Sequence, residues 1–210
     1  MIIELNKIRQ VLMSHMTIIP PTDLGHDILH IDRVYKNAMR LCESYPEADK
    51  LVVTVASIMH DCVPIHKNHV LRKRASELSA HECLSQLDQK DIKITDIQRE
   101  KIFDAVLCHS HSANIDTKFL ESKIVQDADR LDAIGAIGLA RCFTVSNSMG
   151  QSIYLADQPF TPIDGTAIGH ILKKIITLPN LMHTPEAKKI AKDRMEIIKL
   201  YLEALEQEIL

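Results

Sequence analysis

The sequence has no tryptophan, few other aromatic residues and no long apolar run. Nowhere do eighteen apolar residues stand together, which argues against a transmembrane helix. Glu4, Lys7 and Arg9 interrupt the apolar N-terminus before it reaches the length of a signal-peptide core. The five cysteines are odd in number and form no CxxC pair, which argues against a disulfide framework and a zinc or redox motif. We therefore expect a cytoplasmic protein with reduced thiols and no membrane partner.

The chain also lacks an excess of positive charge. Its 25 Lys and Arg residues stand against 28 Asp and Glu residues, a formal net charge of -3 at pH 7. A protein that binds polynucleotides nonspecifically needs cations to meet the phosphates, so no polynucleotide partner is expected. The hydrophobic fraction of 46% is ordinary for a globular protein, and 210 residues suit one domain.

What the chain does have is helical periodicity along most of its length. Apolar residues recur at spacings of three and four, and prolines mark where helices end. The pattern predicts a first helix that ends before Pro20, followed by helices over Asp27–Cys42, Glu47–His60, Ser76–Leu87, Thr95–Leu107, Lys123–Phe143, Ala167–Leu178 and Pro185–Glu208. Thr95 stands where a helix N-cap is expected. The predicted fold is an all-α, single-domain helical bundle.

One segment breaks this pattern. In residues 146–165 the loop-forming residues Asn147, Gly150, Pro159, Pro162 and Gly165 interrupt the helical pattern, and a loop of that length in a compact domain is usually functional, such as a lid, or poorly ordered. The predicted organisation is one domain over residues 1–210, with a core at about 22–145, this loop as a lid, and C-terminal helices at about 166–208.

Histidine is abundant, with 11 residues, and several stand beside aspartates. Four stretches stand out: Gly25–His30, Met59–Asp61, Cys108–His111 and Gln126–Asp132. Imidazole and carboxylate are the mixed donors that suit Mn, Fe, Co, Ni or Zn. His60 and Asp61 end the most apolar predicted helix, where a polar pair must be satisfied, and a metal ion is one way to do so.

Helical geometry narrows the candidate ligands. Asp127 and Asp129 lie about 200° apart on a helix, so they do not face one ion together. Asp129 shares a face with Asp132, and we assign Asp129 as a ligand and Asp132 as its support. His26 and His30 also share a face and either could bind, with His30 favoured because it lies in the apolar stripe. From spacing alone, a metal site explains these residues about as well as two simpler alternatives do. The histidines could be hydrogen-bonded residues at helix ends, and the aspartates could cap helices.

The order His30, His60-Asp61, Asp129 resembles the HD superfamily of metal-dependent phosphohydrolases, and especially its small bacterial predicted HD-domain hydrolases. The likeness covers nearly the whole chain and rests on the stretches His26–Val34, Lys67–His69, His109–Ala113 and, most specifically, Asp127–Arg141. It implies an HD-domain bundle with one divalent metal ion held by His30, His60, Asp61 and Asp129. The ion would be Mn, Mg, Co, Ni, Fe or Zn, with Mn or Mg favoured.

The resemblance also implies hydrolysis of a phosphoester or phosphoanhydride bond in a small phosphorylated metabolite, with a nucleotide as the leading candidate. The expected site residues are Lys67, His109 and Asp127 for catalysis, and His26, Lys67, Arg72 and Arg130 for substrate binding. His109 is expected to contact phosphate or to act as a general acid. The simpler alternatives are a solvated basic turn over Arg72–Arg74 and an Arg130–Asp127 ion pair.

One position departs from the family pattern. HD nucleotidases often carry a carboxylate three residues after the paired aspartate, where it can orient or deprotonate water, and here that residue is Pro64. Either Asp127 takes that role, or the acidity of the metal suffices, or the reaction differs. Two alternatives therefore stay open: a catalytically silent metal- and nucleotide-binding module, and a di-iron HD-fold oxidase with extra ligands from His26, His109 or His111. The sequence also allows a homo-oligomer.

Overall fold

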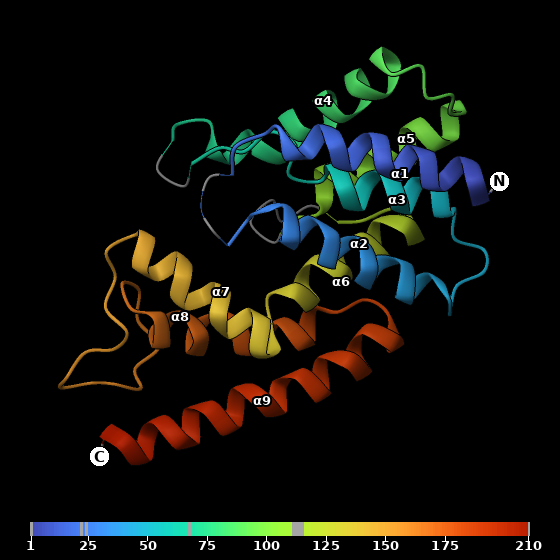
Figure 1. Ribbon diagram of the computed structural model, residues 1–210. Coiled ribbons are helices and arrows are strands. Elements are labelled where there is room, and N and C mark those ends of the chain that lie inside the picture. Colours follow the sequence, from blue (N-terminus) through green and yellow to red (C-terminus); the bar gives the residue numbers. More distant parts are fainter. Residues whose placement is uncertain (1, 22, 24, 67–68, 111–115, 210) are drawn as a thin grey trace. The chain divides into compact units, whose positions relative to one another are not determined.

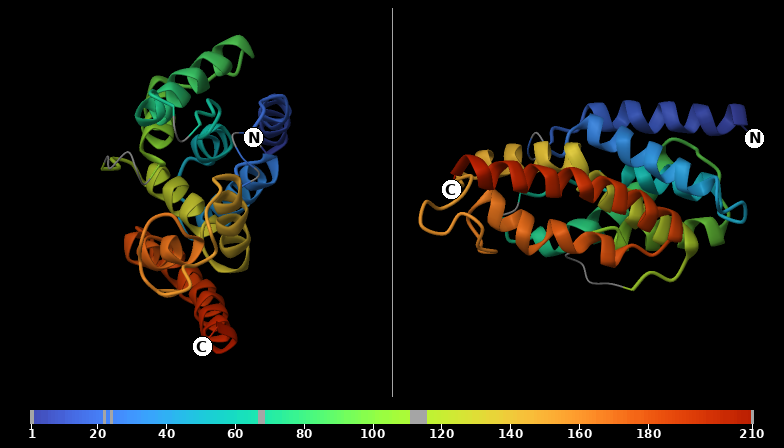
Figure 2. Two further views of the ribbon diagram at one scale, coloured as in Figure 1. Left: turned by 90° about the vertical axis from the view of Figure 1, so that its left-hand side faces the viewer. Right: turned by 90° about the horizontal axis from the view of Figure 1, so that it is seen from below.

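The computed structural model describes residues 2–21, 23, 25–66, 69–110 and 116–209. Within these ranges the chain forms helices joined by loops (Figure 1, Figure 2) and contains no β-strand beyond an isolated bridge between Ser152 and Thr166. The predicted all-α fold class is confirmed.

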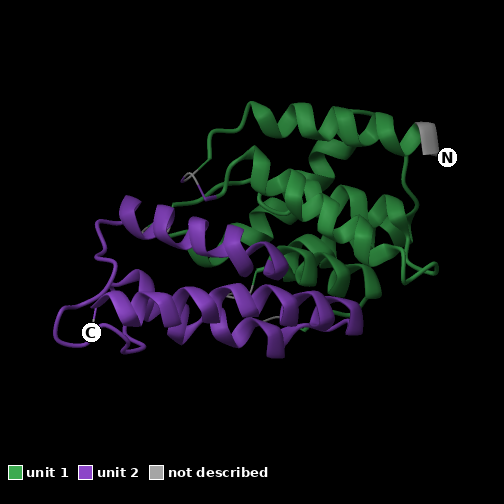
Figure 3. Ribbon diagram, turned by 60° about the horizontal axis from the view of Figure 1, so that its bottom comes forward, with its two compact units in different colours: residues 1–22, 26–129 green, residues 23–25, 130–210 purple. Residues whose placement is uncertain are grey.

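The chain forms two compact units, shown in different colours in Figure 3. The first comprises Met1–Thr22 and His26–Asp129, and the second comprises Asp23–Gly25 and Arg130–Leu210. The single-domain span with its core and lid boundaries stays a prediction.

Helices α1 to α6 build the first unit, with α6 belonging to it as far as Asp129. Their bounds are α1 Ile2–Thr17, α2 Ile28–Cys42, α3 Lys50–Met59, α4 Ala75–Gln89, α5 Asp96–Cys108 and α6 Leu120–Asp132, with a short 3-10 helix, η1, at Arg72–Arg74.

Helix α3 is the centre of this unit. It packs against α1, α2, α4 and α5, and every residue from Val52 to Met59 is buried. A helix that is apolar on all its faces is stable only when it is surrounded by other elements. The chain therefore brings His60 and Asp61, which directly follow this helix, into the middle of the unit.

Side-chain caps fix the starts of three helices. The Asp27 carboxylate accepts from the His30 amide at the start of α2, and Asp49 accepts from the Leu51 amide at the start of α3. Thr95 caps α5, and its capping box with Gln98 confirms the predicted N-cap. These caps set where α2 and α3 begin, and therefore which residues face the cluster described below.

Glu121 on α6 joins three helices of the first unit. Its Oε1 accepts from the Asp49 amide at 2.9 Å and from Lys101 Nζ at 2.8 Å, and its side chain is almost completely buried. Burial alone would raise the pKa of Glu121, but Lys101 and the Asp49 amide hold that pKa below its usual value. The negative charge of Glu121 therefore stabilises the packing of α6 on α3 and α5.

Replacing Glu121 with alanine is expected to lower the free energy of unfolding by about 2–3 kcal/mol, because it leaves the Asp49 amide and Lys101 without their acceptor. Since the folded-state pKa is lowered, the charge contributes its full stability above the pKa of about 4.3 of unfolded glutamate and loses it as the pH falls below that value. Urea unfolding across this pH range measures both effects. Glu77→Ala, which removes an exposed pair with Arg74, is the control. Equal urea midpoints for the two variants would contradict the role of Glu121.

The second unit consists of α7 (Gly135–Ser148), α8 (Ala167–Lys173), a 3-10 helix η3 (Ile175–Leu181) and α9 (Pro185–Ile209). Helix α7 packs on α8 and α9, and the rings of Phe143 and Tyr201 lie 5.5 Å apart between α7 and α9. The loop between α7 and α8 is tied at its ends, because Ala167 and Ile168 donate to the carbonyls of Ser152 and Ile153.

Two predicted helices are wrong in their extent. The predicted helix over 123–143 is split into α6 and α7, because Ile134 is extended and Gly135 adopts a positive φ of 75°, which a continuous helix cannot contain. The predicted helix over 167–178 ends at Lys173 and continues as the 3-10 helix that contains Pro179. Both breaks occur where an apolar pattern continues past a local change in backbone conformation.

Candidate metal centre and active site

Four polar side chains from three helices converge within the first unit. His30 stands in the first turn of α2, His60 and Asp61 follow the last residue of α3, and Asp129 stands on α6. His30 Nε2 lies 3.3 Å from His60 Nε2 and 3.6 Å from Asp129 Oδ1. His60 Nε2 lies 3.7 Å from Asp61 Oδ2. One atom each of His30, His60 and Asp61 lie within 4.8 Å of one another. We call these four residues the His-Asp cluster.

The end of α3 orients His60. Its Nδ1 lies 2.9 Å from the carbonyl oxygen of Ser57, and because a carbonyl only accepts, Nδ1 carries the proton. The Nε2 of the neutral ring then presents a lone pair to the cluster. Complete burial lowers the pKa of His60 to about 4, which keeps the ring neutral at physiological pH. The backbone of α3 thus holds this imidazole in the form that a metal ion requires.

His109, which follows the last residue of α5, contacts the other side of Asp61. Its Nε2 lies 3.3 Å from Asp61 Oδ1, and its Nδ1 donates to the Val106 carbonyl at 2.7 Å. Burial alone would lower the pKa of His109, but the contact with Asp61 raises it. Burial alone would raise the pKa of Asp61, but the contact with His109 holds it well below its usual range. The pair therefore favours an ionised Asp61 beside a protonated His109.

The donors of the His-Asp cluster fit a divalent cation. Ligand atoms about 2.0–2.2 Å from one ion lie roughly 3–3.5 Å apart, close to the separations of 3.3–3.7 Å found here. Two carboxylates would balance the charge of a divalent ion, and two imidazoles would supply nitrogen donors. The mutual distances suit a metal ion held by His30, His60 and Asp61, whose donor atoms all lie within 4.8 Å of one another, and Asp129 of α6 approaches this group at His30.

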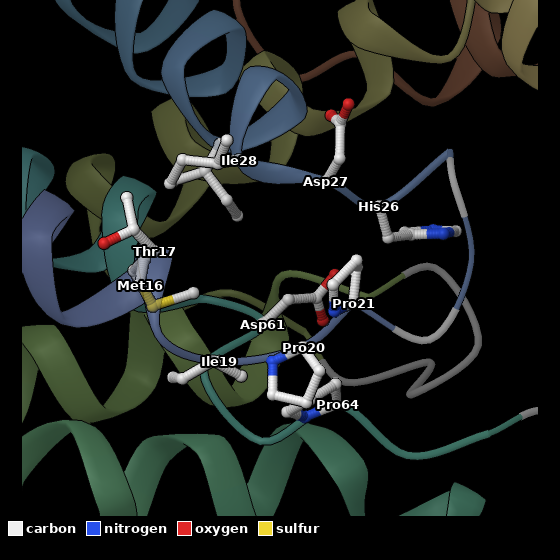
Figure 4. Close-up of a pocket in the computed structure, with 11 residues that line it drawn as sticks. Met16, Thr17, Ile19, Pro20, Pro21, His26, Asp27, Ile28, Asp61 and Pro64 are labelled. Atoms are coloured by element: carbon white, nitrogen blue, oxygen red, sulfur yellow. The ribbon is translucent and has the colours of Figure 1, made fainter.

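A cavity of about 160 Å³ opens beside Asp61 (Figure 4). It lies within the first unit, between the end of α1, the start of α2 and the segment that follows α3, and its described lining is Met16, Thr17, Ile19, Pro20, Pro21, His26, Asp27, Ile28, Ile31, Asp61 and Pro64. The Asp61 side chain is 31% exposed. A molecule in this cavity can therefore reach a carboxylate of the His-Asp cluster.

A family model of the HD domain matches residues 28–134, about half of the chain, and contains all four residues of the His-Asp cluster. The chain belongs to the HD-domain family. The resemblance inferred from the order of histidines and aspartates is confirmed.

Proteins that are similar along the whole chain are also found. YpgQ of Bacillus subtilis is 30% identical over 98% of this chain and 95% of its own. A crystal structure of YpgQ matches with a TM-score of 0.74, 30% identity, and coverage of 99% of this chain and 96% of that one. A structure of YpgQ in complex with ADP matches with a TM-score of 0.72 and 28% identity, with the same coverage. An HD-superfamily hydrolase from Bacillus thuringiensis matches with a TM-score of 0.72 and 26% identity, over 97% of this chain and 95% of that one.

Three further residues that the HD pattern singled out lie in the first unit. His26 lines the cavity, and its ring lies 5.7 Å from that of His30. His109 contacts Asp61, as described above. Asp127 on α6 is completely buried, while Asp129, two residues later, contacts His30. The roles predicted for these residues stay predictions.

The remaining predicted site residues have other surroundings. Arg72 on η1 donates to the Ile65 carbonyl at 3.2 Å. Arg130 belongs to the second unit and donates to the Leu181 carbonyl. Asp132, expected to support Asp129, also belongs to the second unit and pairs with Arg141 at 2.9 Å. Lys67 and His111 lie outside the described residues.

Sequence reasoning did not find the apolar wall of the cavity. Met16 and Ile19 belong to no functional motif in the sequence, and Pro20 and Pro21 indicated only where the first helix ends. A double proline placed shortly before the first histidine of the HD motif was the available signal. Both prolines line the cavity beside Asp61, and their rings restrict the backbone there.

Among the described residues, no helix has the length and apolar character needed to cross a bilayer.

Proposed function

We propose that this HD protein is a metal-dependent hydrolase that cleaves a phosphoester or phosphoanhydride bond in a small phosphorylated metabolite, with a nucleotide as substrate. The observation that carries the proposal is the convergence of His30, His60, Asp61 and Asp129 beside an open cavity. Membership of the HD family supports the hydrolase class. The ADP complex of YpgQ supports a nucleotide ligand.

The His-Asp cluster would hold the metal ion. When bound, a divalent ion would lower the pKa of water towards about 7, so that a nucleophile is available at neutral pH, and it would also polarise a phosphoryl oxygen. Mn or Mg is the ion we expect, because carboxylates suit these cations, and the two imidazoles make Fe, Ni or Zn the alternatives. Asp61 must be ionised to serve, and its contact with His109 keeps it so.

His109 is the chain's own proton donor in this scheme. Its Nδ1 is fixed by the Val106 carbonyl, so Nε2 is the nitrogen that faces the site. A protonated Nε2 beside Asp61 can donate to the oxygen that leaves phosphorus, or to a phosphoryl oxygen as negative charge builds up there. Both roles need the imidazole close to the cluster, and the structure provides this.

Pro64 favours one alternative function. It lines the cavity beside Asp61, at the position where related nucleotidases often carry a water-orienting carboxylate. A chain that lost this group could keep the metal and the nucleotide and yet lack turnover. The second candidate function is therefore a catalytically silent binding module.

A substrate screen distinguishes these functions. Chelator-treated protein is given Mn, Mg, Co or Ni and then incubated with nucleoside mono-, di- and triphosphates, while phosphate and pyrophosphate release are measured. The hydrolase predicts metal-dependent release from at least one class. Calorimetric binding of both metal and nucleotide without release from any substrate would favour the silent module instead. Two irons per chain together with oxygen consumption would favour an oxidase.

A further inference from the structure

Helix α5 ends directly before the proposed proton donor. Cys108 is its last residue, and His109 follows it. The last carbonyl groups of a helix have no partner within the helix, and a buried carbonyl that lacks a donor is costly. Because Cys108 and His109 are both buried, side-chain donors stabilise this end of α5. These donors therefore determine where His109 is held.

Two side chains donate to carbonyls at the end of α5. The His109 ring donates from Nδ1 to the Val106 carbonyl at 2.7 Å. The Gln126 amide on α6 donates from Nε2 to the Cys108 carbonyl at 2.6 Å. The first contact fixes the His109 ring relative to α5, and the second fixes the end of α5 relative to α6.

Gln126 connects His109 to the helix that carries Asp129. Gln126 and Asp129 stand three residues apart on α6, a spacing that puts both on one face of the helix. The Gln126 side chain is buried, with 4% of the residue exposed, so bulk water competes little for its amide. One helix thus holds a residue of the His-Asp cluster and the contact that anchors His109.

We propose that Gln126 is a positioning residue, which holds the end of α5 so that His109 Nε2 stays beside Asp61. That separation is 3.3 Å to Asp61 Oδ1. A displacement of about 1 Å in a reacting group can lower the rate about a hundredfold. The inference rests on the proposed function, in which His109 donates a proton, and extends it to a residue that acts through His109.

Removing the amide of Gln126 tests this role. Gln126→Met keeps roughly the length of the side chain but takes the donor away from the Cys108 carbonyl. We expect kcat for metal-dependent phosphate or pyrophosphate release to fall about tenfold to a hundredfold, while KM and Mn affinity stay within about threefold of the wild type. Wild-type kcat in folded Gln126→Met, or a fall in Mn affinity as large as the fall in kcat, would overturn the role.

The matched control is Gln86→Met on α4. Gln86 is also buried, with 8% exposed, and its Nε2 donates to Glu82 and Gln89 of the same helix. This variant loses a buried amide away from the end of α5, so its kinetics should equal those of the wild type. An equal fall in kcat for both variants would contradict the proposal. If Gln126→Met does not fold, Gln126→Asn repeats the test, because its amide is one carbon too short to reach Cys108.

A double-mutant cycle shows whether Gln126 acts through His109. In His109→Gln the proton donor is already absent, so adding Gln126→Met should change kcat by less than about twofold. The same fold-loss in both backgrounds would overturn the proposal, because Gln126 would then affect the site by another route.

A spectroscopic measurement separates this inference from the proposed function. In protein that carries isotope-labelled histidine, the NMR signal of the His109 Nδ1 proton is identified by its absence from His109→Gln. We expect this proton to exchange with water about tenfold faster in Gln126→Met, where the end of α5 opens more often, and at the wild-type rate in Gln86→Met. If the wild type hydrolyses no substrate, the proposed function fails while this comparison still tests Gln126. Unchanged exchange in Gln126→Met would overturn the positioning role in either case.

Discussion

Replacing Asp61 with alanine is expected to lower kcat/KM for metal-dependent phosphate or pyrophosphate release by about 10³-fold or more. Asp61 stands at the centre of the site, because one carboxylate oxygen lies near His60 and the other near His109. Its removal takes a negative charge from the metal ligands and separates the metal from the proton donor. Metal affinity should fall together with activity, and calorimetric titration with Mn measures it independently of turnover.

A second acidic residue provides the control for Asp61. Asp164→Ala removes a carboxylate of the second unit that is 84% exposed and pairs with Lys173, and we expect its metal affinity and kinetics to equal those of the wild type. The thermal midpoint without metal separates a lost site from a lost fold. If Asp61→Ala folds normally and retains full metal-dependent turnover, the assigned centre is wrong.

Replacing His109 with glutamine is expected to lower kcat by about 10²–10⁴-fold, the usual range for losing a general acid. The effect should differ in kind from that of Asp61→Ala. The ligand atoms of His30, His60, Asp61 and Asp129 remain in His109→Gln, so Mn should still bind within about tenfold of the wild-type affinity. A fall in kcat with retained metal affinity would mark His109 as a proton donor or phosphoryl contact.

The matched control for His109 is His81→Gln on α4. His81 is exposed and meets Phe103 edge to face, with ring centroids 5.0 Å apart, so the kinetics of His81→Gln should equal those of the wild type. A His109→Gln variant that loses Mn as completely as Asp61→Ala would make His109 a metal ligand. Such a result would revive the di-iron alternative, and counting the irons bound per chain would then decide between them.

Most helices could be predicted because their causes are local. The apolar stripe on one face of α2, the apolar run of α3 and the Thr95 cap of α5 each act on residues that are close to them in the chain. The break between α6 and α7 could not be predicted in this way. Its small and apolar residues are equally typical of a helix, and the extended Ile134 together with the positive φ of Gly135, which packs against the Arg194 side chain of α9, interrupts it.

The aspartates of α6 show what helical periodicity can predict and what it cannot. The 100° rotation per residue separated Asp129 from Asp127, and the structure places Asp129 beside His30 and buries Asp127 completely. The same rotation grouped Asp132 with Asp129. In the second unit Asp132 pairs with Arg141, a partner that the rotation could not predict. Periodicity gives the face of a helix, but it does not give the neighbour that this face meets.

The helical class, most helix limits and the residue types able to bind a metal follow from the amino-acid sequence, because capping and amphipathic spacing act over one or two turns. Packing between distant segments brings together the first turn of α2, the end of α3 and the last turn of α6, and adds His109 from the end of α5. The cavity beside them likewise exists only once the end of α1 packs near the start of α2. These outcomes depend on long-range packing around the buried helix α3, which no local pattern encodes.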